Sequence, residues 1–128
     1  MGWLNFRKGK DKEPPPGPGP DFSDVDMGRA EELAKAGTLA PLYMMPLRFG
    51  GEESARNRLY VPPVAVALKD RCDDMVEDLL RQEKVNGYEC RPEYKGTSVV
   101  PTAVTVTAKQ KGEPVFTQRI QIWGGKGQ

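Results

Sequence analysis

Apolar side chains recur at helical spacing along residues 62–84, and this is the clearest pattern in the chain. The apolar stripe consists of Ala65, Leu68, Cys72, Met75, Val76, Leu79 and Leu80. The opposite side is charged and consists of Lys69, Asp70, Asp73, Asp74, Glu77, Asp78 and Arg81. This division predicts an amphipathic helix that places Leu68 and Leu79 in the core. Pro62 and Pro63 open it, because the first amides of a helix lack partners.

A shorter helix is predicted over residues 23–36, where apolar positions again recur at helical spacing. Ser23 or Asp24 caps its start by accepting a hydrogen bond from a free backbone amide. Gly37 follows the last good helix former and ends the helix. Residues 39–49 are apolar and predict a strand, and the two prolines inside this run favour an edge strand.

Three strand-like runs follow the long helix, over residues 87–94, 102–109 and 114–123, with glycine-containing turns between them. In the middle run, apolar residues at even positions alternate with threonines at odd positions. Such alternation predicts a sheet that is covered on one face and solvated on the other. The chain is therefore expected to have an α+β fold, with one mostly antiparallel sheet of about four strands and two helices packed on one face.

The chain divides into three parts by composition. Residues 1–20 carry four basic and two acidic side chains and contain "EPPPGPGP", which cannot continue a helix or bury apolar surface. They are expected to form a flexible basic leader. Residues 21–124 form a single α+β domain, and residues 125–128 are expected to be a disordered tail.

The composition excludes several classes of function. The chain of 128 residues has no histidine, which removes the commonest general base and the commonest zinc ligand. The two cysteines, Cys72 and Cys90, are too few for a zinc site and are expected to be small buried hydrophobic residues, although a disulfide between them stays open. The net charge of +1 makes nucleic acid an unlikely partner. We expect no cofactor and no metal site.

The sequence favours a cytoplasmic location, because no secretory signal and no apolar run of about 20 residues is present. The segment 1–12 combines three large apolar residues with four cations, which is compatible with weak contact with an acidic membrane surface. A peripheral membrane protein is therefore one alternative for the function.

The stretch "LRFGGEESARN" between the predicted strand and the long helix is the first candidate site. An irregular loop that a sheet and a helix hold in place is suited to recognition, here through Glu52, Glu53, Arg56 and Asn57. Glu52 and Glu53 also raise the alternative of a small enzyme that uses them as an acid–base pair. A third alternative is structural: the polar side chains cap the helix or tie the loop to the sheet.

The last strands provide the second candidate site. Tyr88, Tyr94 and Trp123 are expected to form an aromatic patch on the uncovered sheet face, beside Arg91 and Arg119. Aromatic residues and arginine are enriched at protein interfaces, so a protein partner is expected.

The segments "PLRFGGEESARNRLYVPP", "GYECRPEYKGTSVVP" and the terminal "IQIW" resemble small uncharacterised bacterial α+β proteins. Some bacterial proteins of this size and build are immunity proteins, which block a toxin by occluding it. The lack of catalytic motifs, the polar loop and the expected aromatic patch together predict a non-enzymatic protein-binding module of a bacterial cytoplasm. The resemblance points to a toxin-neutralising or regulatory role for it. The oligomeric state stays open.

Overall fold

The computed structural model describes residues 21–124. Two α-helices and five strands follow one another in the order α1 (Met27–Lys35), β1 (Ala40–Tyr43), β2 (Arg58–Val61), α2 (Pro63–Arg81), β3 (Gly87–Glu93), β4 (Ala103–Gln110) and β5 (Glu113–Gln121). Two short 3-10 helices, Leu47–Phe49 and Ala55–Asn57, lie in the connection between β1 and β2. The expected flexible leader and disordered tail lie outside the described residues.

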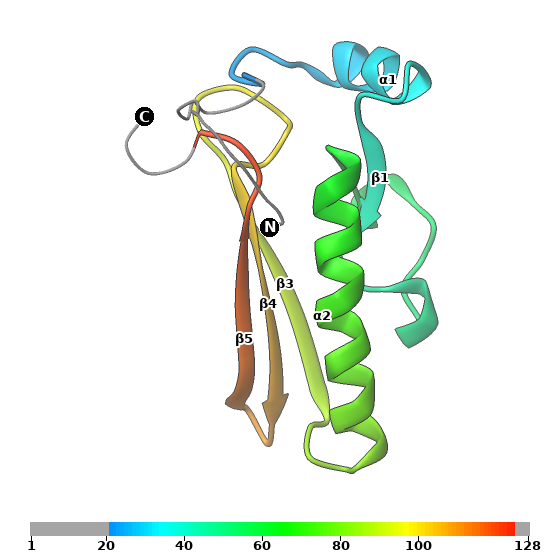
Figure 1. The fold of residues 1–128 in the computed structure, drawn as a ribbon, viewed down its shortest axis with the longest axis vertical. Coiled ribbons are helices and arrows are strands. Elements are labelled where there is room, and N and C mark those ends of the chain that lie inside the picture. The colour runs from blue at the N-terminus through cyan, green and yellow to red at the C-terminus, as the bar shows by residue number, and fades with distance from the viewer. Residues whose placement is uncertain (1–20, 125–128) are drawn as a thin grey trace, which may run out of the picture.

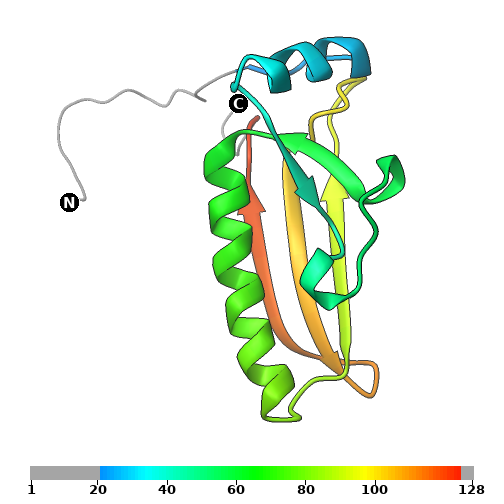
Figure 2. The ribbon, with the colours of Figure 1, turned by 90° about the vertical axis from the view of Figure 1, so that its right-hand side faces the viewer.

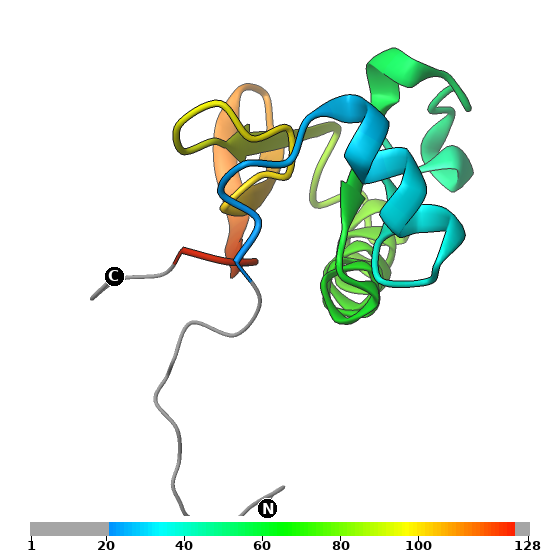
Figure 3. The same cartoon turned by 90° about the horizontal axis from the view of Figure 1, so that it is seen from above.

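The strands form two antiparallel sheets, a β1–β2 pair and a three-stranded sheet of order β3-β4-β5. The α+β class is confirmed, whereas the expected single sheet of about four strands is not. Helix α2 and the β1–β2 pair lie side by side and together cover one face of the three-stranded sheet (Figures 1 and 2). Helix α1 crosses the end of this arrangement (Figure 3), so the two helices do not share one face as expected.

The β1–β2 pair differs most from the expectation. Strand β1 ends at Tyr43, so much of the predicted run 39–49 belongs to the loop. Strand β2 was not predicted, although Leu59 and Val61 are buried and alternate with half-buried neighbours. This alternation is the period-two pattern of a strand, but it covers only four residues.

Helix α1 begins at Met27, four residues later than the predicted start at residue 23. Asp26, rather than Ser23 or Asp24, is its N-cap, and its carboxylate accepts a hydrogen bond of 2.8 Å from the backbone amide of Arg29. Gly37 follows the C-cap in the left-handed conformation, with φ of 85°, which is the role expected of it.

Helix α2 forms where it was predicted, but a different side of it is buried. Leu68 and Met75 are 40% and 48% exposed, so the prediction that Leu68 is a core residue is wrong. Leu79 is partly buried and packs against the core. The charged side chains of Lys69 and Asp73, which were predicted to face solvent, are buried instead. The β1–β2 pair, called the hairpin below, lies beside one flank of the helix, and the opposite flank extends past β5 at the edge of the sheet (Figure 2).

The interior consists of two hydrophobic clusters. The larger lies between the sheet, α2 and the β1–β2 pair, and Val61, Val104 and Val106 are fully buried in it. The smaller lies beneath α1 and joins Phe22 near the start of the described chain to Trp123 near its end. The two clusters fix the position of the hairpin and of the β3–β4 connection.

Candidate functional site

The loop between β1 and β2 is held together by Asn57. Its side-chain oxygen accepts a hydrogen bond from the Met45 amide at 2.8 Å, and its side-chain nitrogen donates to the carbonyls of Met45 at 2.8 Å and Glu52 at 2.9 Å. Gly51, within the same loop, lies so close to Met45 that an added Cβ would be 1.9 Å from the Met45 carbonyl oxygen. Asn57 therefore has a structural role, which was one of the three alternatives for this loop.

The two glutamates of the loop are exposed and do not form a paired acid–base site. The Glu53 carboxylate accepts a hydrogen bond of 3.2 Å from the Tyr43 hydroxyl. Glu52 accepts a hydrogen bond from Asn57 through its backbone carbonyl and not through its side chain. Neither side chain lines the cavity described below. General acid–base chemistry needs a positioned pair within reach of one substrate, and this geometry gives no support for it.

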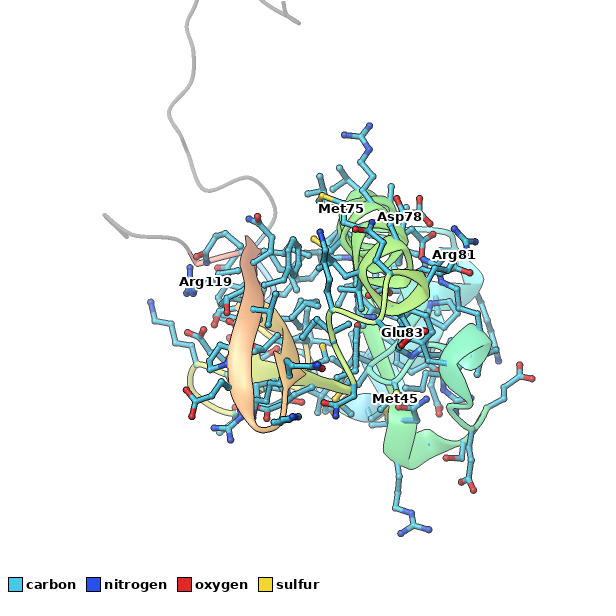
Figure 4. All side chains as sticks on the ribbon, turned by 90° about the horizontal axis from the view of Figure 1, so that it is seen from below. Met45, Met75, Asp78, Arg81, Glu83 and Arg119 are labelled. Carbon is cyan, nitrogen blue, oxygen red and sulfur yellow. The ribbon has the colours of Figure 1, made fainter. Side chains whose placement is uncertain are left out.

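The second predicted set is divided between the two faces of the sheet. Tyr88 points inward and packs against the main cluster, and Trp123 is buried, where its indole nitrogen donates to the Val100 carbonyl at 2.9 Å. Arg91 and Arg119 lie on the opposite face, and Figure 4 shows Arg119 pointing away from α2. The predicted aromatic patch is therefore not formed.

Arg91 and Arg119 are engaged within the outer sheet face. Arg119 donates two hydrogen bonds to the carboxylate of Glu93, at 3.0 and 3.1 Å, and these bonds lower the pKa of that carboxyl below its ordinary value. Arg91 pairs with Glu89, whose other oxygen accepts a hydrogen bond from Lys109. Such rows of alternating charge are typical of a solvated sheet face.

The two predicted sets, one in the loop and one on the last strands, each contribute one residue to the same cavity. Arg56 of the loop and Tyr94, just beyond β3, line a cavity of about 340 Å³ together with Arg58 and Tyr60 of β2. The remaining lining comes from Met27, Met44, Ala55, Leu59, Ser98 and Val99. We call this cavity the arginine–tyrosine pocket.

The electrostatics of the arginine–tyrosine pocket are cationic. The guanidinium of Arg58 lies 5.7 Å from the centre of the Tyr60 ring, within the range of a cation–π contact. Neither Arg56 nor Arg58 forms an ion pair with another residue of the described part of the chain. Burial raises the pKa of Tyr94 above its ordinary value, so its phenol stays neutral and can donate a hydrogen bond. The pocket therefore offers positive charge, aromatic rings and a phenol to one ligand.

Sequence reasoning missed Arg58 and Tyr60 because β2 was not predicted. The alternation of Arg58 and Tyr60 with the apolar residues Leu59 and Val61 was the available signal. Only four residues carry this signal, and a proline ends the run, so the sequence alone did not predict a strand there.

A buried polar network lies between α2 and β3. The Lys69 ammonium donates to the Asp73 carboxylate at 2.8 Å and to the Tyr88 hydroxyl at 2.9 Å, and that hydroxyl donates to the other Asp73 oxygen at 2.6 Å. The Lys69 and Asp73 side chains are each only 3% exposed. Burial, together with the hydrogen bond to Asp73, raises the pKa of Tyr88 far above its ordinary value. The phenol therefore stays protonated, and the network is a structural one that satisfies its own members.

The two cysteines lie on either side of the interface between α2 and β3, and both are free thiols. Cys72 is buried in the main cluster, and Cys90 packs against it. Burial raises the pKa of Cys90 to about 11, which disfavours the reactive thiolate at neutral pH. This agrees with the expectation that they act as small hydrophobic residues.

Other features common at functional sites are missing from the described part of the chain. Residues 21–124 contain no group of three or more side chains placed to hold a metal ion. Neither of their helices is both long and apolar enough to cross a membrane. Comparisons with protein-family models, curated proteins and solved structures found no match to this chain.

Proposed function

We propose that the chain is a non-enzymatic protein-binding module of a bacterial cytoplasm, with a toxin-neutralising or regulatory role. The observation that carries the proposal is the arginine–tyrosine pocket, in which Arg56, Arg58, Tyr60 and Tyr94 line one cavity. Arginine and tyrosine are enriched among the residues that dominate binding energy at protein interfaces.

The chemistry of the pocket defines the partner segment. A guanidinium binds a carboxylate through paired, charge-assisted hydrogen bonds. Met27 and Met44 on the pocket wall add adaptable apolar surface. A partner that presents an acidic side chain beside an apolar or aromatic one fits this combination. The two arginines would also steer an acidic partner during encounter, so association should weaken with salt.

Capture from the native host with three baits tests this proposal. The baits are the wild-type chain, an Arg56→Glu, Arg58→Glu double variant, and an Arg81→Glu control on the end of α2. Wild type and control should retain the same protein. The double variant should lose it, and calorimetry with that purified protein should give a dissociation constant raised by about tenfold or more.

The outcome is interpretable only if the double variant keeps its fold, which circular dichroism and thermal melting check. A folded double variant that captures the partner as well as wild type would exclude the arginine–tyrosine pocket. A captured protein with no acidic segment in its contact surface would contradict the proposed chemistry.

A further inference from the structure

One long edge of the molecule is left open by the described elements. Strand β5 pairs with β4 on one side and with no other strand of residues 21–124 on the other. Helix α2 lies beside this strand (Figure 2) and presents three exposed apolar side chains, Val64, Leu68 and Met75. Their spacing of four and seven residues places them on one side of the helix. Figure 4 shows Met75 on the flank of α2 away from Met45 and the hairpin.

We infer that this open edge, formed by β5 and the exposed apolar side of α2, is where the chain pairs with a second copy of itself. An occupant of the edge must supply backbone groups to a free strand and apolar side chains to a helix at the same time. A copy related by a two-fold axis supplies both, because it presents the same strand and the same helix. The lining of the arginine–tyrosine pocket contains no residue of α2 or β5, so the pocket stays accessible.

The sequence of β5 favours one register of pairing. Pro114 and the bulge at the register shift near the start of β5 disfavour pairing there. Antiparallel pairing centred on Gln118 would place Phe116 opposite the partner's Ile120, and both of these positions face α2. A register centred on Arg119 would instead oppose two like charges directly, which is destabilising.

The size of the edge fits a stable dimer. A nine-residue strand is about 30 Å long, and a helix packed on a sheet gives the edge a depth of about 20 Å. The flat area is therefore roughly 600 Å² per partner, which is the lower end of the range of about 600–1,000 Å² per partner for stable interfaces.

Light scattering and sedimentation of the full chain test the inference. Wild type should have twice the chain mass of 14.2 kDa. A Leu68→Glu, Met75→Glu variant should raise the dimer dissociation constant about tenfold or more, because it buries like charges. Leu80→Glu is the matched control: it is 46% exposed on the same helix, about 140° around the axis from Met75. It should leave the dimer intact.

Cross-linking tests the register independently. Under mild oxidation, Gln118→Cys should give a covalent dimer that a reductant reverses, whereas Thr105→Cys on the central strand β4 should not. A monomeric wild type at its highest soluble concentration would overturn the inference. So would a double glutamate variant that dimerises like wild type. Deletion of residues 1–20 that turns a monomer into a dimer would also overturn it, because the chain's own leader would then occupy the edge.

Discussion

Two charged networks connect α2 to the rest of the molecule, one on its outside and one in the interior. On the outside, Arg48 of the loop donates to the carboxylates of Asp74 at 2.7 Å and Glu77 at 3.0 Å. In the interior, Lys69 and Asp73 form an ion pair that the Tyr88 hydroxyl completes. The bond lengths are alike, but the surroundings differ, because water reaches the first network and not the second.

This difference decides what each network does for stability. An exposed ion pair typically contributes about 0–1 kcal/mol, because water and salt screen it. A buried pair contributes little net stability, since desolvation offsets the attraction, but removing one partner leaves an uncompensated charge in the interior. The buried network therefore constrains how α2 and β3 dock, whereas the outer one only adds to a contact that apolar packing already makes.

Asp73→Ala should have the largest effect on stability. It leaves the Lys69 ammonium buried without its carboxylate, and the free energy of unfolding should fall by about 3–5 kcal/mol. Urea denaturation followed by circular dichroism measures this. A Lys69→Met, Asp73→Leu double variant removes both charges and should recover most of the loss. A cost below about 1 kcal/mol for Asp73→Ala would show that the two networks behave alike.

Raising the pH should have the second-largest effect on the free energy of unfolding, through the buried network. The pKa of Tyr88 is raised from its ordinary value of 10.0, so above that pH the phenol ionises in the unfolded chain and not in the folded one. Its contribution is fully present below pH 10 and is lost as the pH rises, at about 1.4 kcal/mol per pH unit. Unfolding free energies measured from pH 8 to 11.5 should fall more steeply for wild type than for Tyr88→Phe. Tyr43→Phe, outside the network, should keep the steep decline.

Arg48→Met should have the smallest effect. It removes the exposed ion pairs but keeps an apolar stem against Phe49, so the cost should be about 0–1 kcal/mol. The cost should shrink further in about 1 M salt, where the Debye length falls to about 3 Å. Denaturation at low and high salt measures both effects. A loss as large as that of Asp73→Ala, unchanged by salt, would remove the contrast between the networks.

The three-stranded sheet was predictable because its signal is repeated. Strands β3, β4 and β5 match the predicted runs within one or two residues. In β4 the buried residues Val104, Val106 and Ala108 alternate with the half-buried residues Thr105 and Thr107. Strand β2 has the same kind of signal over four residues only, so a neighbouring loop and a proline obscured it.

The burial of α2 and the composition of the site could not be predicted in the same way. Hydropathy assigns Lys69 and Asp73 to solvent, and only the hydrogen bonds to each other and to Tyr88 make their burial tolerable. The spacing of four residues between Lys69 and Asp73 was a local signal for an ion pair, but it did not indicate that the pair would be buried. The meeting of Arg56 and Tyr94 depends on how the hairpin docks beside the β3–β4 connection, which is a tertiary effect.

The smaller hydrophobic cluster links the two ends of the described domain. Phe22 and Trp123 pack in one cluster beneath α1, although almost the whole domain separates them in sequence. Every strand pairing, by contrast, joins strands that are consecutive in the chain, and such local contacts form early in folding. The smaller cluster requires both ends of the domain to be in place at once, so we expect it to form last during folding. Nearby ends also make this domain suited to circular permutation, with a short linker joining the ends and new termini opened in the β4–β5 turn.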